Sequence, residues 1–198
     1  MDDSFNFKTF KATHMRFPLI LLLLFLSACH KPVYTEYYEK GNYSEFTTHP
    51  FLMEVPGYRI LSVTASRRCP GKTICNPKEI KLTLWLETKF AYLQGKDFGI
   101  LAGGEKIDLN RRRYHFAYNI ESKYKDGTTG FAIERWVVWI KVEEFNKVAN
   151  GKKIQMLISQ EPLEVPSTVM ETWRILVQKS LLLKTMDEED QRNYNEYT

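Results

Sequence analysis

The signatures of the common hydrolases and nucleotide-binding proteins are absent from this sequence. It contains no GxSxG, no HExxH, no Walker loop and no glycine-rich dinucleotide fingerprint. Histidine is scarce, and the three that follow residue 29 lie in no motif with a nucleophile or a metal-ligand partner; they are His30, His49 and His115. The net charge of +4 is too small and too dispersed for a nucleic-acid-binding protein. We therefore expect no catalytic residues, no cofactor, no metal site and no nucleic-acid partner.

Long apolar runs are also missing. The uncharged run FPLILLLLFLSA, Phe17–Ala28, is too short to span a bilayer, because a transmembrane helix needs about 20 apolar residues. It suits the core of a secretory signal, which covers about 7 to 15 residues after a positive region. The positive residues are Lys8, Lys11, His14 and Arg16. We predict that residues 1–28 are a signal peptide, with Met15 as an alternative start that would make residues 1–14 an upstream extension.

Cysteine is rare, and its count of three is odd, so pairing leaves one thiol to explain. The apolar run ends in Leu26-Ser27-Ala28-Cys29, which resembles the lipobox of bacterial lipoproteins at every position. The resemblance implies cleavage before Cys29 by signal peptidase II and a diacylglyceryl group on its thiol. Two or three acyl chains, such as palmitate, suffice for stable anchoring.

The lipoprotein resemblance also implies a location. The chain would lie in the bacterial cell envelope, attached to the membrane through its N-terminal lipid. His30 follows the cysteine where aspartate would favour inner-membrane retention, so in a Gram-negative host we expect the outer membrane, facing the periplasm or the surface. Residues 29–56 contain proline, glycine, asparagine, serine and threonine without a sustained period, and we predict an acylated tether there.

The remaining cysteines, Cys69 and Cys75, are separated by five residues that include Pro70-Gly71. Thiols of an exported protein meet an oxidising compartment, and the Pro-Gly turn lets the two approach, so we predict a disulfide. A redox role would favour the shorter CxxC spacing, and zinc would need two further ligands.

The rest of the chain alternates in the manner of β-strands. Ile80, Leu82, Leu84 and Leu86 share one face, and Gly103-Gly104 predicts a hairpin turn. Tyr114–Glu121 and Phe131–Val142 predict a second hairpin, and helical patterns cover Val142–Asn150 and the residues after Ser167. The sequence therefore predicts a mainly β (α+β) fold, with an antiparallel sheet or sandwich, a short helix and a C-terminal amphipathic helix.

We place the β-rich domain at residues 57–183 and a polar tail at 184–198. The order of elements in the domain resembles the C-terminal half of β-rich bacterial envelope proteins of unknown function. That group brings no catalytic residues. Glu134, Glu143 and Glu144 could in principle form an acid/base pair, but carboxylates on a strand face or at a helix start are usually solvated or capping.

Five arginines near strand ends are candidates for an anion-binding patch: Arg67, Arg68, Arg111, Arg112 and Arg113. Protection of sheet edges is the alternative role for these charges. The sequence thus predicts a lipid-anchored envelope protein with a binding or scaffolding role, which is not an enzyme. Its partner would be an envelope protein or an anionic envelope polymer. An enzyme with a dispersed site, and an accessory subunit of an envelope assembly or secretion system, remain as alternatives.

Overall fold

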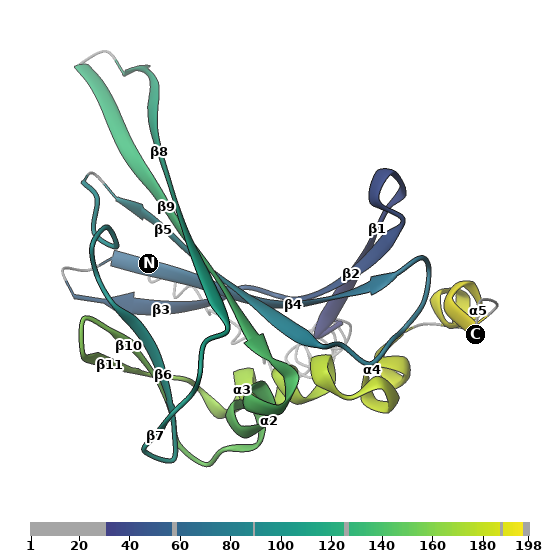
Figure 1. Ribbon diagram of the computed structural model, residues 1–198. Coiled ribbons are helices and arrows are strands. Elements are labelled where there is room, and N and C mark those ends of the chain that lie inside the picture. Colours follow the sequence, from purple (N-terminus) through teal and green to yellow (C-terminus); the bar gives the residue numbers. More distant parts are fainter. Residues whose placement is uncertain (1–30, 57–58, 89, 125–126, 187, 196–198) are drawn as a thin grey trace, which may run out of the picture. The chain divides into compact units, whose positions relative to one another are not determined.

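A computed structural model describes residues 31–56, 59–88, 90–124, 127–186 and 188–195 of the chain (Figure 1). The predicted signal peptide, Cys29 and His30 lie outside the described residues. Pro32–Thr198 forms one compact unit. Among the described residues, no helix is long and apolar enough to cross a membrane.

The main element is a seven-stranded antiparallel sheet. Its strand order is β1-β2-β4-β5-β9-β8, and β3 pairs with β4 beyond the end of β2. In Figure 1 the long hairpin of β8 and β9 rises on one side of the sheet and β1 rises on the other. The strands are β1 (Val33–Tyr38), β2 (Tyr43–Thr48), β3 (Phe51–Val55), β4 (Arg59–Pro70), β5 (Glu79–Thr88), β8 (Arg111–Tyr124) and β9 (Gly127–Lys141).

Alternation along the strands gives the sheet two different faces. In β5 the side chains of Ile80, Leu82, Leu84 and Leu86 are fully buried, whereas the residues between them are half-buried or exposed. The register places Leu82 opposite Ala65 in β4 and Val138 in β9. Paired residues on antiparallel strands point to the same face of the sheet, so these buried side chains form one continuous face, which we call the covered face. The opposite face is the open face.

A smaller antiparallel sheet has the order β11-β10-β6-β7. Its strands are β6 (Phe98–Ala102), β7 (Glu105–Lys106), β10 (Ile154–Ile158) and β11 (Glu161–Glu164). Gly103 and Gly104 make the β6–β7 turn with φ values of 60° and 92°, a conformation that favours glycine. The rings of Phe98 and Trp136 lie 5.6 Å apart, so β6 packs on the covered face at β9.

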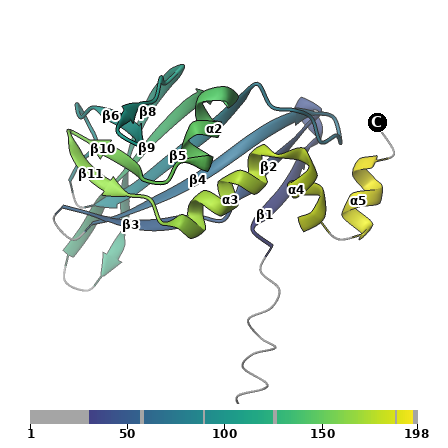
Figure 2. The ribbon, with the colours of Figure 1, turned by 90° about the horizontal axis from the view of Figure 1, so that it is seen from below.

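Helices complete the core on the covered face (Figure 2). They are α2 (Val142–Asn150), α3 (Ser167–Val177), α4 (Lys179–Thr185) and α5 (Glu188–Asn195), and a 3-10 turn, η1 (Glu39–Gly41), joins β1 to β2. Trp173 of α3 is fully buried, with its ring 5.4 Å from Phe145 of α2 and 5.7 Å from Phe51 of β3. One apolar core therefore joins the helices to the sheet.

The predicted fold class is confirmed: the protein is mainly β with antiparallel sheets and helices. Both predicted hairpins and the short helix are present. The C-terminal helix is present too, but it ends at Val177, and α4 begins at Lys179 after a non-helical Gln178.

The tether predicted at residues 29–56 is wrong over the part that the structure describes. Residues 33–55 form β1, η1, β2 and β3, and they bury Val33, Phe46 and Met53 in the core. Gly41 and Asn42 form the hairpin turn between β1 and β2, where Asn42 adopts a φ of 46°. The predicted boundary of the domain at residue 57 is therefore too late.

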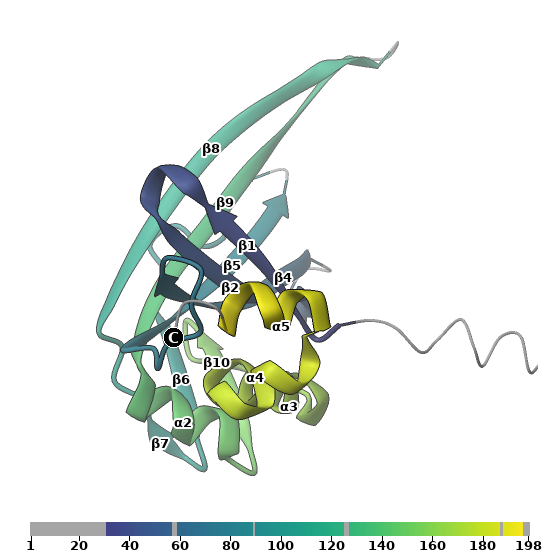
Figure 3. The same ribbon diagram turned by 90° about the vertical axis from the view of Figure 1, so that its right-hand side faces the viewer.

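The polar C-terminal tail contains a helix. Most of its described residues lie in α5 (Figure 3). Tyr194 of this helix is buried, and its ring centre lies 5.6 Å from that of Phe46. One aromatic contact thus attaches the polar helix to the sheet.

Candidate functional site

A groove of about 920 Å³ lies at one end of the open face. It crosses the sheet from β2 and β4 to β8 and β9, and the loop between β4 and β5 supplies further residues. Its lining mixes cations, carboxylates and one tryptophan. The lining residues are Glu45, Ser66, Arg68, Pro70, Cys75, Asn76, Pro77, Lys78, Glu79, Lys81, Asn110, Arg111, Trp139, Lys141, Val142 and Glu143.

The strand register brings these side chains together. Ser66 pairs with Lys81, Lys81 with Trp139, and Trp139 with Arg111, so four neighbouring strands contribute to one row. Neighbouring strands are about 4.8 Å apart, so β4 and β8 are about 14 Å apart across this row. The groove is therefore long enough to meet several groups of an extended ligand.

Glu45 organises the β2–β4 side of the groove. It is 7% exposed, and its carboxylate accepts hydrogen bonds from Ser66 Oγ at 2.7 Å, from Arg68 at 3.2 Å and from Lys81 Nζ. Burial alone would raise the pKa of Glu45, but the Lys81 and Ser66 hydrogen bonds outweigh burial and hold that pKa below its ordinary value. The carboxylate stays ionised and fixes the two cations beside it.

Arg111 is held in a similar way on the β8–β9 side. Its guanidinium lies 4.5 Å from the centre of the Trp139 ring and donates to Glu79 at 3.0 Å. Arg113 approaches the same ring at 5.7 Å. An arginine stacked on an aromatic ring and paired at its edge loses little freedom when it binds an anion.

Lys78 and Lys141 add positive charge to the groove. Neither Lys78 nor Lys141 forms an ion pair with any described residue, and both are exposed. The lining contains five lysines and arginines against three glutamates, a formal excess of +2. The groove can therefore attract a carboxylate or phosphate group.

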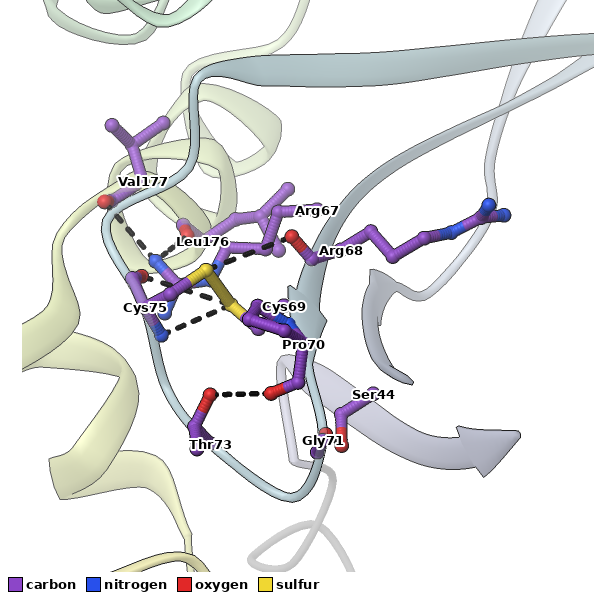
Figure 4. The surroundings of a disulfide bond; sticks show 10 residues. All are labelled: Ser44, Arg67, Arg68, Cys69, Pro70, Gly71, Thr73, Cys75, Leu176 and Val177. Atoms are coloured by element: carbon purple, nitrogen blue, oxygen red, sulfur yellow. Dashed lines mark hydrogen bonds between the residues drawn. A yellow bond between two sulfur atoms is a disulfide. The ribbon is translucent and has the colours of Figure 1, made fainter. Parts of the chain in front are cut away.

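The predicted disulfide forms part of the groove wall (Figure 4). The sulfurs of Cys69 and Cys75 lie at bonding distance, and the Cα atoms are 5.5 Å apart. The ring turns at Gly71, whose φ is 58°, and Ser44 Oγ donates to the Gly71 carbonyl at 2.7 Å. The bond thus ties the segment from Cys75 to Lys78 to the end of β4.

The five predicted arginines do not meet on one surface. Arg68 and Arg111 line the groove, and Arg113 lies beside it on the open face. Arg112 faces the other side of β8, where it pairs with Asp97 at 3.4 Å. Arg67 is 1% exposed and points into the core, away from Arg68 (Figure 4).

Arg67 contacts the end of α3. Its Nη1 donates to the carbonyl oxygens of Leu176 at 3.0 Å and Val177 at 3.3 Å, and its guanidinium lies 5.3 Å from the Phe46 ring centre. No described residue accepts a hydrogen bond from Nε or Nη2. Burial lowers the pKa of Arg67 to about 10. The residue is structural, with no access to a ligand in the groove.

The sequence interpretation of Glu134 as a solvated carboxylate is wrong. This side chain is fully buried on the covered face. It accepts hydrogen bonds from three successive backbone N–H groups, those of Tyr92, Leu93 and Gln94, and from Tyr114 Oη at 2.7 Å. Burial, followed by the bond to Glu134, raises the pKa of Tyr114, so this phenol remains a donor. The cluster attaches the loop before β6 to the sheet.

The described residues do not assemble a metal site. No group of three histidines, cysteines, aspartates or glutamates able to hold a metal ion occurs among them. His49 packs against Tyr34 with 5.5 Å between ring centres, and His115 is exposed on β8. No protein family, curated protein or solved structure matches this chain.

Proposed function

We propose that this protein is a membrane-anchored binding module of the bacterial cell envelope. Acyl chains on Cys29 hold it to the membrane, and the groove on the open face binds an anionic component of the envelope. The groove is the observation that carries the binding role, because its cations are positioned by Glu45, Glu79 and Trp139. The Leu26-Ser27-Ala28-Cys29 motif supports the anchor.

The anchor is tested by metabolic labelling. Cells that express the full chain with labelled palmitate are expected to yield a labelled protein, and Cys29→Ser is expected to remove the label, because only a thiol accepts the diacylglyceryl group. Cys75→Ser, at a cysteine far from the lipobox, should keep it. Label retained in Cys29→Ser would exclude acylation at this residue.

The groove is tested with inorganic polyphosphate as the probe. Arg111→Glu replaces a positive groove residue by a negative one and is expected to weaken binding at low salt on the order of tenfold or more. Arg112→Glu makes the same charge change at the next residue, on the other side of β8, and serves as the control. Equal affinities for both variants would assign the effect to net charge and reject the groove as the site.

A further inference from the structure

Most of the exposed large hydrophobic residues lie on the open face of the sheet. Among the described residues, seven such side chains are at least 36% exposed. The register assigns five of them to the open face, and the other two are Phe90, in a loop, and Phe116, on the other side of β8. The five are Tyr34 (43%), Tyr38 (36%), Leu52 (68%), Ile60 (51%) and Trp85 (41%).

The open face thus combines aromatic and aliphatic side chains with the cationic groove. Tyrosine and tryptophan are enriched where proteins meet the membrane–water interface, and lysine and arginine are attracted to anionic lipids. Glu54 pairs with Ile60, and Glu87 follows Leu86, where the β4–β5 pairing ends, so both carboxylates are at the end of the face away from the groove. The groove end is therefore the part of the face suited to phosphate groups.

The start of the fold limits how far this face can be from the anchor. β1 begins at Val33, only four residues after Cys29. Four extended residues span at most about 14 Å, whereas each headgroup layer is about 5 to 8 Å thick. An acylated Cys29 would therefore hold the first strand at the surface of the bilayer.

The register also relates this strand to the groove. Tyr34 pairs with Thr47, and Thr47 pairs with Ser66, the first residue of the row that crosses the groove to Arg111. Two strand spacings, about 10 Å, separate Tyr34 from Ser66 along this row. The anchored end of the domain and the groove therefore lie close together on one sheet.

We propose that the open face docks on the bilayer that holds Cys29, and that the groove takes the phosphate groups of anionic phospholipids. This inference rests on the proposed function, since it uses the acyl anchor and names the ligand of the same groove. Docking would bring Lys78, Lys141 and Arg111 to the headgroups, while Lys106 and Lys153, both near the β6–β7 turn of the smaller sheet, would remain in water.

Lysine footprinting of the acylated protein tests the docked state. The full mature protein is reconstituted into phosphatidylcholine vesicles with or without phosphatidylglycerol, and amine labelling of each lysine is followed by mass spectrometry. With phosphatidylglycerol at low salt, labelling of Lys78 and Lys141 is expected to slow, while Lys106 and Lys153 react at unchanged rates. High salt should remove the difference, because it screens the headgroup charge.

A matched pair of variants separates docking from general charge. Arg111→Glu is expected to weaken docking on the order of thirtyfold, since each positive charge near an anionic surface changes the equilibrium about fivefold. The labelling of Lys141 should then reach its rate in neutral vesicles. Arg112→Glu should keep Lys141 protected. Lys78→Glu reverses a second positive charge in the groove, and the labelling rate of Lys141 again measures docking.

The outcomes distinguish the inference from the function on which it rests. Protein that carries acyl chains and floats with the vesicles, yet shows no protection of Lys141, would overturn docking alone. If the protein carries no palmitate and does not float with the vesicles, the proposed anchor is rejected. Protection by added polyphosphate but not by phosphatidylglycerol vesicles would reject the bilayer and assign the groove to a soluble anionic polymer.

Discussion

Replacement of Glu134 by glutamine is expected to lower the free energy of unfolding by about 3 kcal/mol. The carboxylate accepts bonds from three backbone N–H groups and the Tyr114 hydroxyl in a fully buried position. Glutamine has the same shape, but the NH2 group of its amide would face the backbone N–H groups and the Tyr114 hydroxyl. Buried hydrogen-bond donors would then be left without an acceptor. Urea unfolding followed by tryptophan fluorescence measures the change.

Two further variants make the Glu134 prediction specific. Glu87→Gln removes an exposed carboxylate on β5 and is expected to change stability by less than about 0.5 kcal/mol. Tyr114→Phe removes one donor from the cluster and should cost about 1 to 2 kcal/mol. Hydrogen exchange should show faster exchange at residues 92–94 in Glu134→Gln. A Glu134 variant as stable as Glu87→Gln would contradict the role of the buried carboxylate.

Replacement of Arg67 by alanine is expected to lower the free energy of unfolding by about 3 kcal/mol. The substitution leaves a cavity beside Phe46 and removes the donor to the last carbonyls of α3. Those carbonyls carry the negative end of the helix dipole, so a cation is well placed there. The same unfolding measurement gives the size of the loss.

Arg67→Met separates volume from charge. It fills the space without burying a guanidinium whose Nε and Nη2 have no acceptor among the described residues, so its stability should lie within about 1 kcal/mol of the natural protein. Arg68→Ala is the matched control on the open face, where a half-exposed ion pair contributes less than about 1 kcal/mol. If Arg67→Met destabilised the protein as much as Arg67→Ala does, the guanidinium itself would be essential for stability.

The fold class could be predicted because period-two alternation depends on which face of a strand is buried. Ile80, Leu82, Leu84 and Leu86 show this pattern, and the core lies where they indicate. The alternation of apolar and polar residues is weaker in β1. Tyr34 and Tyr38 occupy its exposed positions, so the exposed face is nearly as hydrophobic as the buried one. Its tyrosine and threonine content was the available signal for a strand.

The candidate site was harder to predict. Neighbouring residues such as Arg67 and Arg68 lie on opposite faces of one strand, so a cluster of charges in the sequence does not make a cluster in space. The partners of Arg68 and Arg111 come from other strands, at Glu45 and Trp139, and only the register brings them together. Burial of Glu134 likewise depends on a loop 40 or more residues earlier in the chain.

The Cys69–Cys75 ring has a consequence for the maturation of the protein. The bond fastens the segment from Cys75 to Lys78, which forms one wall of the groove, to the end of β4. Thiols remain reduced in the cytosol and pair only in an oxidising compartment. For a chain exported as we propose, this wall of the groove is therefore fastened to β4 only after translocation.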